Sequence, residues 1–209
     1  MNIVISNLSK KIRDTIVLSN VNLSFQSGTI YGLCGENGSG KTMLMRAICG
    51  LILPTSGTVC IDGKVLGRDI DFPNDTGILI ENPAFVSNMS AFDNLKLLSS
   101  IRDVSNEKSI REYIKKVGLD PDSKKKYKKF SLGMKQKLGI AAAFFEENEL
   151  VILDEPYNAL DEDSIEPVNN LIREAKERGA IVILASHNKE LLTNIADIII
   201  KLKGGTIEK

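Results

Sequence analysis

The stretch Gly35–Thr42, with the sequence GENGSGKT, constrains the fold of this chain more than any other segment. It matches the pattern G-x-x-x-x-G-K-[ST] at every fixed position. A short apolar run over residues 28–34 precedes it, and residues 43–49 carry apolar side chains at helical spacing. A strand, a glycine-rich turn and a helix N-terminus in this order direct several backbone N–H groups at one point. The segment therefore predicts a phosphate-binding loop, and its flanks argue against a glycine-rich turn with an incidental lysine.

Each residue type in this loop has a chemical role in binding a phosphate chain. The glycines let the backbone approach phosphate oxygens closely, because they carry no side chain. The ammonium group of Lys41 is expected on the β and γ phosphates, and the hydroxyl of Thr42 on Mg²⁺. The residues predicted to bind the nucleotide are Gly35, Glu36, Asn37, Gly38, Ser39, Gly40, Lys41, Thr42 and Met43.

Composition places the chain among ordinary globular proteins. Its 209 residues are 43% hydrophobic, enough for one substantial core. Lys+Arg and Asp+Glu both number 27, so the formal charge of zero argues against a general nucleic-acid binder. The N-terminus shows no signal-peptide pattern, the three cysteines form no C-x-x-C pair, and no apolar run is long enough to span a membrane. We therefore expect a cytoplasmic protein that meets a membrane only through a partner.

Hydrophobic periodicity predicts three kinds of structure along the chain. Residues 1–25 alternate with a turn at Arg13-Asp14, and a second hairpin is expected around Asp62-Gly63. Residues 90–147 have helical spacing. A short strand is expected over Gly77–Ile80, and the last third alternates strands with a helix, over Leu150–Leu153, Ser164–Arg178, Ile181–Ala185 and Asp197–Leu202. Short apolar strands of this kind predict a parallel sheet covered on both faces.

A second site motif follows the apolar run Leu150–Leu153, where Asp154, Glu155 and Pro156 end the predicted strand. Ligands of open α/β sheets bind at the carboxyl ends of the strands. Asp154 is then placed to hold Mg²⁺, and Glu155 to polarise a water for attack on the γ phosphate. The plain alternative is a solvated turn, but an aspartate after an apolar strand is the partner that the phosphate-binding loop requires.

With these motifs on one chain, the sequence resembles the ATP-binding subunits of ABC transporters over essentially its whole length. Three further segments carry the resemblance. The run 130–136, FSLGMKQ, is similar to the family's signature sequence, residues 158–161, NALD, to the loop that joins two subunits, and residues 185–187, ASH, to the histidine switch. The only histidine of the chain, His187, lies in the last of them.

The resemblance implies both a fold and a mechanism. It implies one domain over residues 1–209, an α/β P-loop NTPase core with a mainly parallel sheet flanked by helices, a small antiparallel β subdomain and an inserted α-helical subdomain. We assign residues 1–27 and 57–70 to the antiparallel part, residues 83–147 to the helical insertion, and to the core residues 28–56, 71–82 and 148–209.

The same resemblance implies ATP hydrolysis with Mg²⁺ by a head-to-tail pair of subunits, either two copies or this chain with a relative. Lys41, Glu155 and His187 are then the catalytic residues. Ser131 and Gly133 bind the γ phosphate of the nucleotide held by the opposite subunit. Closure of the pair drives a separate transmembrane permease, which holds the chain on the inner face of the membrane.

Two positions depart from the family pattern. The glutamine that usually ligates Mg²⁺ and touches the permease corresponds to Glu81, and the aromatic residue that stacks on adenine corresponds to Ile12. A carboxylate at position 81 can still bind magnesium, whereas the loss of the aromatic ring predicts weaker ATP binding. The run IENPAF from Ile80 to Phe85, together with SLGMKQ, is similar to the bacterial subgroup for bacitracin and lantibiotic export or immunity.

Two other functions remain open at this point. The first is a soluble ATPase of the same superfamily in DNA repair or translation, although such proteins usually carry two cassettes or long coiled-coil insertions. The second is a nucleotide-gated binding or immunity module in which hydrolysis is incidental, and the unusual Leu132 and Met134 of the signature segment leave room for it. The cargo and the direction of transport are not readable from the sequence.

Overall fold

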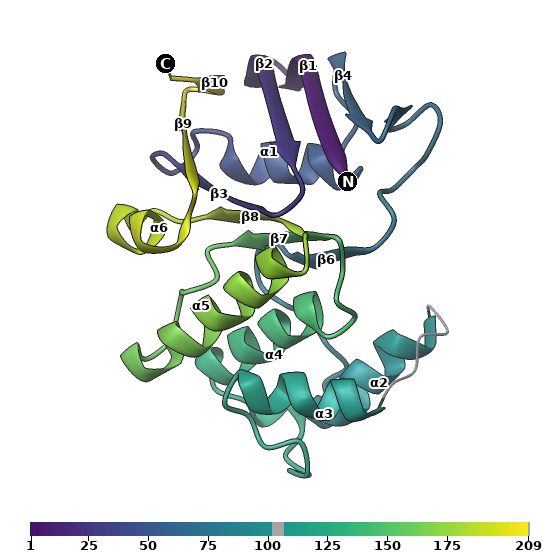
Figure 1. Ribbon diagram of the computed structural model, residues 1–209, viewed down its shortest axis with the longest axis vertical. Coiled ribbons are helices and arrows are strands. Elements are labelled where there is room, and N and C mark those ends of the chain that lie inside the picture. Colours follow the sequence, from purple (N-terminus) through teal and green to yellow (C-terminus); the bar gives the residue numbers. More distant parts are fainter. Residues whose placement is uncertain (102–106, 209) are drawn as a thin grey trace.

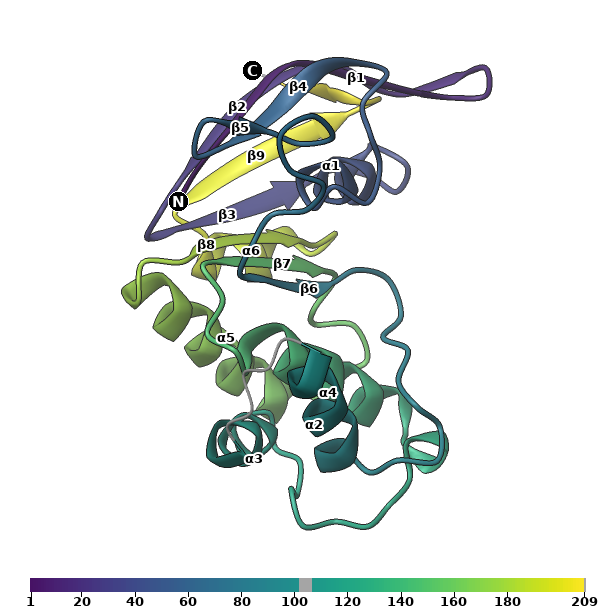
Figure 2. The same ribbon diagram turned by 90° about the vertical axis from the view of Figure 1, so that its right-hand side faces the viewer.

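The computed structural model describes residues 1–101 and 107–208, which form stacked layers of sheet and helix (Figures 1 and 2). The helices are α1 (Lys41–Ile48), α2 (Ala91–Ile101), α3 (Glu107–Lys116), the 3₁₀ turn η1 (Tyr127–Lys129), α4 (Leu132–Phe144), α5 (Glu162–Glu177) and α6 (Lys189–Ile195). The strands are β1 (Asn2–Ile12), β2 (Thr15–Gln26), β3 (Thr29–Cys34), β4 (Ser56–Ile61), β5 (Lys64–Val65), β6 (Thr76–Leu79), β7 (Leu150–Asp154), β8 (Ile181–Ala185), β9 (Ile198–Lys203) and β10 (Thr206–Ile207).

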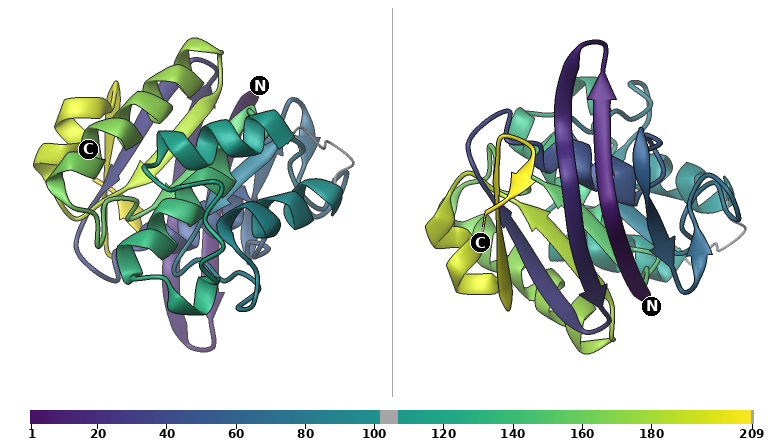
Figure 3. Two further views of the ribbon diagram at one scale, coloured as in Figure 1. Left: turned by 90° about the horizontal axis from the view of Figure 1, so that it is seen from below. Right: turned by 90° about the horizontal axis from the view of Figure 1, so that it is seen from above.

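The central sheet has the order β10-β9-β3-β8-β7-β6, and its strands from β9 to β6 run parallel. Helix α1 lies on one face, and α4 and α5 cover the other, as the view from below shows (Figure 3). Every residue of β7 and β8 is buried, as expected for apolar strands covered on both faces. Strand β8 lies between β3 and β7, so the segments that follow these three strands meet at one edge of the sheet.

A second, antiparallel sheet has the order β2-β1-β4-β5 and lies above α1 (Figure 2). Both predicted hairpins are present, since β1 pairs with β2 and β4 pairs with β5. Asp62 and Gly63 both have positive φ, 47° and 81°, which suits the tight turn between β4 and β5. The rings of Phe25 and Tyr31 meet edge to face with centroids 4.8 Å apart and join β2 to β3.

The stretch predicted to be helical, residues 90–147, contains α2, α3, η1 and α4. Its residues 102–106 lie outside the described part of the chain. Helix α4 packs on β6 and β7, where Phe144 is fully buried. The basic run 124–129 contains one buried residue, Tyr127, whose ring packs against Phe85 and Phe130. The division of the chain into three parts remains a prediction.

The C-terminal region differs from the sequence prediction, which ended on a strand over residues 197–202. The structure adds α6 and the short strand β10. Asn188 caps the N-terminus of α6, because its side chain accepts hydrogen bonds from the N–H groups of Glu190 and Leu191. A Gly204-Gly205 turn with positive φ at both residues returns the chain from β9 to β10. Both elements are short, so their periodicity is too weak to show in the sequence.

We expect Gly77→Ala to destabilise the protein strongly. Gly77 lies in β6, and an added Cβ would sit only 1.8 Å from the carbonyl oxygen of Ala143 in α4. Relieving such overlap requires backbone movement, and we expect a loss of about 3 kcal/mol in the free energy of unfolding, measured with urea. Gly63→Ala is the control, since its Cβ would meet open space and only its φ of +81° costs about 1 kcal/mol. Equal losses in the two variants would contradict this account.

Candidate nucleotide site

The glycine-rich loop connects β3 to α1 and has the backbone geometry of a phosphate cradle. Gly38 and Gly40 have φ values of +78° and +107°, and a Cβ at Gly38 would point into open space. The Lys41 ammonium donates to the carbonyl oxygens of Gly35 and Glu36, at 2.7 and 3.1 Å. Lys41 is only 7% exposed, so its charge is held within the loop.

Ser39 supplies a direct test of whether a phosphate group fits this loop. Its side chain is 5% exposed, and its Oγ atom finds no hydrogen-bond partner among the residues that the structure describes. Buried hydroxyl groups are rarely left without a partner, and such an atom in a native structure calls for an explanation. A phosphate oxygen in the loop would satisfy it, so the residues present fit the predicted ligand.

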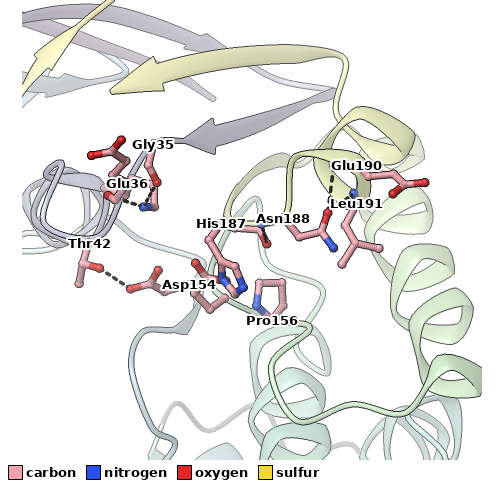
Figure 4. A network of polar contacts seen from close by, with 12 residues as sticks. Gly35, Glu36, Thr42, Asp154, Pro156, His187, Asn188, Glu190 and Leu191 are labelled. Carbon is pink, nitrogen blue, oxygen red and sulfur yellow. Dashed lines mark hydrogen bonds and ion pairs between the residues drawn. The ribbon is translucent and has the colours of Figure 1, made fainter. Parts of the chain in front are cut away.

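Thr42 and Asp154 meet although they are 112 positions apart in the chain, with Thr42 Oγ1 donating to Asp154 Oδ2 at 2.6 Å (Figure 4). Burial raises the pKa of the Asp154 carboxyl, the charges of Glu155 and Glu81 raise it further, and the Thr42 hydrogen bond opposes them. In the described part of the chain, no group of three or more His, Cys, Asp or Glu could hold a metal alone. This arrangement fits Mg²⁺, which usually binds one or two carboxylates together with phosphate oxygens.

Glu155 and His187 form the second contact at this edge, where Glu155 Oε2 lies 2.9 Å from His187 Nδ1. The Glu155 backbone is fixed independently of its carboxylate. Its N–H donates to the Ala185 carbonyl at 2.9 Å, and the buried amide of Gln136 donates to the carbonyls of Glu155 and Pro156, each at 3.1 Å. The Glu155 side chain is 23% exposed, so a water molecule can reach it.

The loop and the histidine line one cleft of about 680 Å³. Three lysines lie on its wall and favour an anionic ligand, although Lys201 is also paired with Glu208. The lining residues are Gly35, Glu36, Asn37, Gly38, Ser39, His187, Lys189, Lys201, Leu202, Lys203 and Gly204.

The other predicted site residues lie apart from this cleft. Ser131 is exposed and caps α4, since its Oγ accepts a hydrogen bond from the Met134 N–H at 3.2 Å. Gly133 packs against residues 158–161, and a Cβ there would lie 2.7 Å from the Ala159 carbonyl. Glu81 pairs with Arg46 at 2.7 Å, and among the described residues its carboxylate makes no hydrogen bond to Thr42. Arg46 was not among the predicted residues.

Gly205 is a second residue of the site that the sequence reasoning missed. Its N–H donates to the Ser39 carbonyl at 3.0 Å, and its own carbonyl accepts from the Ser19 N–H at 2.8 Å. An added Cβ would lie 2.7 Å from the Val17 carbonyl. The Gly204-Gly205 doublet near the end of the chain was the available signal, because two adjacent glycines favour a tight hairpin turn.

Comparison with known proteins places this geometry in a family. The family model described as "ABC transporter" matches residues 18–158. The chain is 46% identical over 206 residues to the uncharacterised ABC transporter ATP-binding protein YybJ of Bacillus subtilis, covering 99% of this chain and 94% of YybJ. It is 38% identical to the lantibiotic transport protein SrtF of Streptococcus pyogenes (93% of this chain, 84% of SrtF) and 38% identical to the bacitracin transport protein BcrA of Enterococcus faecalis (92% and 63%).

The fold leads to the same family. A solved structure titled "Structure of ATP binding subunit of ABC transporter" superposes with a TM-score of 0.90 at 26% identity, covering 100% of this chain and 89% of that one. Among residues 1–101 and 107–208, no helix has the length and apolar character needed to cross a membrane. The match to this solved structure confirms the expected α/β architecture. The chain belongs to the ABC transporter family, as one of its ATP-binding, ATP-hydrolysing subunits.

Proposed function

We propose that this chain drives a bacterial exporter or immunity transporter for peptide antimicrobials, as part of a head-to-tail pair docked on a separate membrane permease at the inner face of the membrane. The observation that carries the proposal is the convergence at the end of β7, where Asp154 contacts Thr42 and Glu155 contacts His187. The names of BcrA and SrtF, which specify bacitracin and lantibiotic transport, support the class of cargo.

The roles of the residues follow from their positions. Lys41 and Ser39 bind the phosphates, and Thr42 and Asp154 hold Mg²⁺, which neutralises charge that develops on the phosphate oxygens. Glu155 accepts a proton as the oxygen of a water molecule bonds to the γ phosphorus and the bond to the bridging oxygen breaks. His187 lies beside Glu155 and the loop, where it can donate to a γ-phosphate oxygen.

The exposed signature segment supports a pair of subunits rather than a complete site in one chain. Ser131 lies on the surface and outside the cleft, so it is available to the nucleotide of an opposite subunit, either a second copy or a relative. A groove of about 500 Å³ supports docking of the permease near residues 81–85. Its wall includes apolar residues, among them the exposed Leu51, Ile78 and Leu98.

The permease assignment is tested by purifying the intact complex from membranes with a tag on this chain. We expect one multispanning membrane subunit to co-purify, and Leu98→Glu in the groove to reduce its yield. Ile16→Glu is the control, because Ile16 is 61% exposed on β2 and lies outside the groove. Absence of a membrane subunit from the purified wild-type complex would favour a soluble ATPase.

The cargo and the need for hydrolysis are tested in cells that depend on the transporter for survival in bacitracin or a lantibiotic. We expect Glu155→Gln to abolish protection, because hydrolysis resets the pair. Protection retained in this variant, with hydrolysis lost, would favour a nucleotide-gated binding module. Sensitivity to these peptides that is the same with and without the wild-type chain would contradict the proposed cargo.

The position that corresponds to the adenine-stacking residue gives a further prediction. Ile12 ends β1 and is 42% exposed, so a larger ring can be accommodated there. We expect Ile12→Tyr to tighten ATP binding by about 1 kcal/mol or more, by analogy with stacking of nucleic-acid bases on aromatic rings. The dissociation constant is measured by calorimetric titration, with Ile16→Tyr as a control on the next strand. Equal affinities of wild type and Ile12→Tyr would contradict the stacking role.

A further inference from the structure

The ion pair between Glu81 and Arg46 joins the segment that follows β6 to helix α1. Glu81 follows the end of β6 and replaces the usual metal-binding glutamine, whereas Arg46 lies on α1 directly behind the phosphate loop. Glu81 Oε1 accepts from Arg46 Nη2 at 2.7 Å. The two side chains are 58% and 31% exposed, so the pair is accessible to solvent and can open.

The pair lies about one helical turn from the proposed magnesium site. Arg46 and Thr42 are four residues apart on α1, and side chains at this spacing lie on the same helix face, about 5–6 Å apart at Cβ. The Glu81 charge also contributes to the raised pKa of the Asp154 carboxyl, so the two carboxylates lie within electrostatic range. Arg46 therefore holds the Glu81 carboxylate, a potential metal ligand, near the Thr42–Asp154 contact without a hydrogen bond to it.

The backbone at Glu81 has an unusual conformation between two anchored flanks. Glu81 has a φ of +59°, a left-handed backbone conformation that residues other than glycine rarely adopt unless their surroundings impose it. The flanking residues are anchored. Leu79 is buried, and Pro83 accepts a hydrogen bond from the Tyr127 hydroxyl and packs against Gly139. Movement is thereby confined to the residues between these anchors.

We propose that Arg46 is a positioning residue that holds the Glu81 carboxylate away from the metal site, and that opening of this pair frees Glu81 to bind Mg²⁺ beside Thr42 and Asp154. The inference rests on the proposed magnesium site. Arg46 also lines the groove near residues 81–85, so the same ion pair lies between that groove and the proposed metal site.

The test measures binding of Mn²⁺, as a spectroscopic substitute for Mg²⁺, by electron paramagnetic resonance with the full chain in excess over a non-hydrolysable ATP analogue. We expect Arg46→Gln to tighten Mn²⁺ binding about two- to fivefold, the range expected for loss of a partly exposed ion pair. Arg46→Lys keeps the positive charge and should retain an affinity near that of wild type. Arg46→Gln should have no effect in a Glu81→Gln background.

Two results would overturn the proposal. One is an Arg46→Gln variant that folds and does not bind Mn²⁺ more tightly. The other is a tightening that persists in the Glu81→Gln background, because it would reflect only the removal of a nearby positive charge. Mn²⁺ binding by Asp154→Asn distinguishes a wrong role for Arg46 from a wrong magnesium site. If Asp154→Asn leaves Mn²⁺ affinity unchanged, the magnesium site itself is wrong, and the role of Arg46 falls with it.

Discussion

Replacing Glu155 with glutamine is expected to slow ATP hydrolysis at least about 100-fold, the lower bound for loss of a general base, while ATP binding is retained. The amide matches the carboxylate in shape but cannot accept a proton. The backbone should not move, because the Glu155 N–H bonds to Ala185 and the Glu155 carbonyl to Gln136. Phosphate release measures turnover, and light scattering after addition of ATP measures pairing. We expect the ATP-bound pair of subunits to accumulate.

Glu177→Gln is the matched control for this experiment. Glu177 is an exposed glutamate at the end of α5, away from the cleft, so its replacement should leave turnover and pairing as in wild type. Hydrolysis at the wild-type rate in Glu155→Gln would contradict the general-base assignment. Loss of ATP binding in the same variant would show that Glu155 has a structural role at the end of β7.

Lys41→Ala is expected to weaken ATP binding about 10- to 100-fold, as for loss of a hydrogen bond from a charged group. The variant loses the contact with the phosphates and also the two bonds that Lys41 makes to the carbonyls of Gly35 and Glu36, at 2.7 and 3.1 Å. Titration with ATP measures the effect. Lys203→Ala is the control, because Lys203 lines the same cleft but lies outside the loop motif. Similar losses in the two variants would mean that charge alone, without loop geometry, determines affinity.

Much of this site could be predicted because its two parts, the glycine-rich loop and the residues at the end of β7, are each continuous in sequence. The loop residues follow one strand, and Asp154 and Glu155 end another, so the rule that ligands bind at the carboxyl ends of strands was enough to predict that Thr42 and Asp154 hold the same Mg²⁺. Their direct hydrogen bond was not predicted. Strand β8 lies between the two strands and places His187 in the same cleft.

The contacts of Glu81 and Gly205 could not be predicted in this way. Arg46 and Glu81 are 35 positions apart, and their contact depends on a left-handed backbone at Glu81 that no local pattern indicates. Gly205 contacts the loop only because β9 runs beside β3, a neighbour relationship set by the whole sheet. Contacts between single side chains or single backbone groups from separate elements leave no periodic trace in a sequence.

The hydrogen bonds of Gly205 join the turn between β9 and β10 to the glycine-rich loop of the candidate site. Its N–H donates to the Ser39 carbonyl at 3.0 Å, and the Ser19 N–H donates to the Gly205 carbonyl at 2.8 Å, so three distant segments meet at one residue. Such an amide exchanges its hydrogen with solvent only when the local structure opens. A ligand that binds the closed loop makes opening rarer. We therefore expect hydrogen exchange at the Gly205 amide to slow when nucleotide is bound, which would make this amide an intrinsic reporter of occupancy that needs no label.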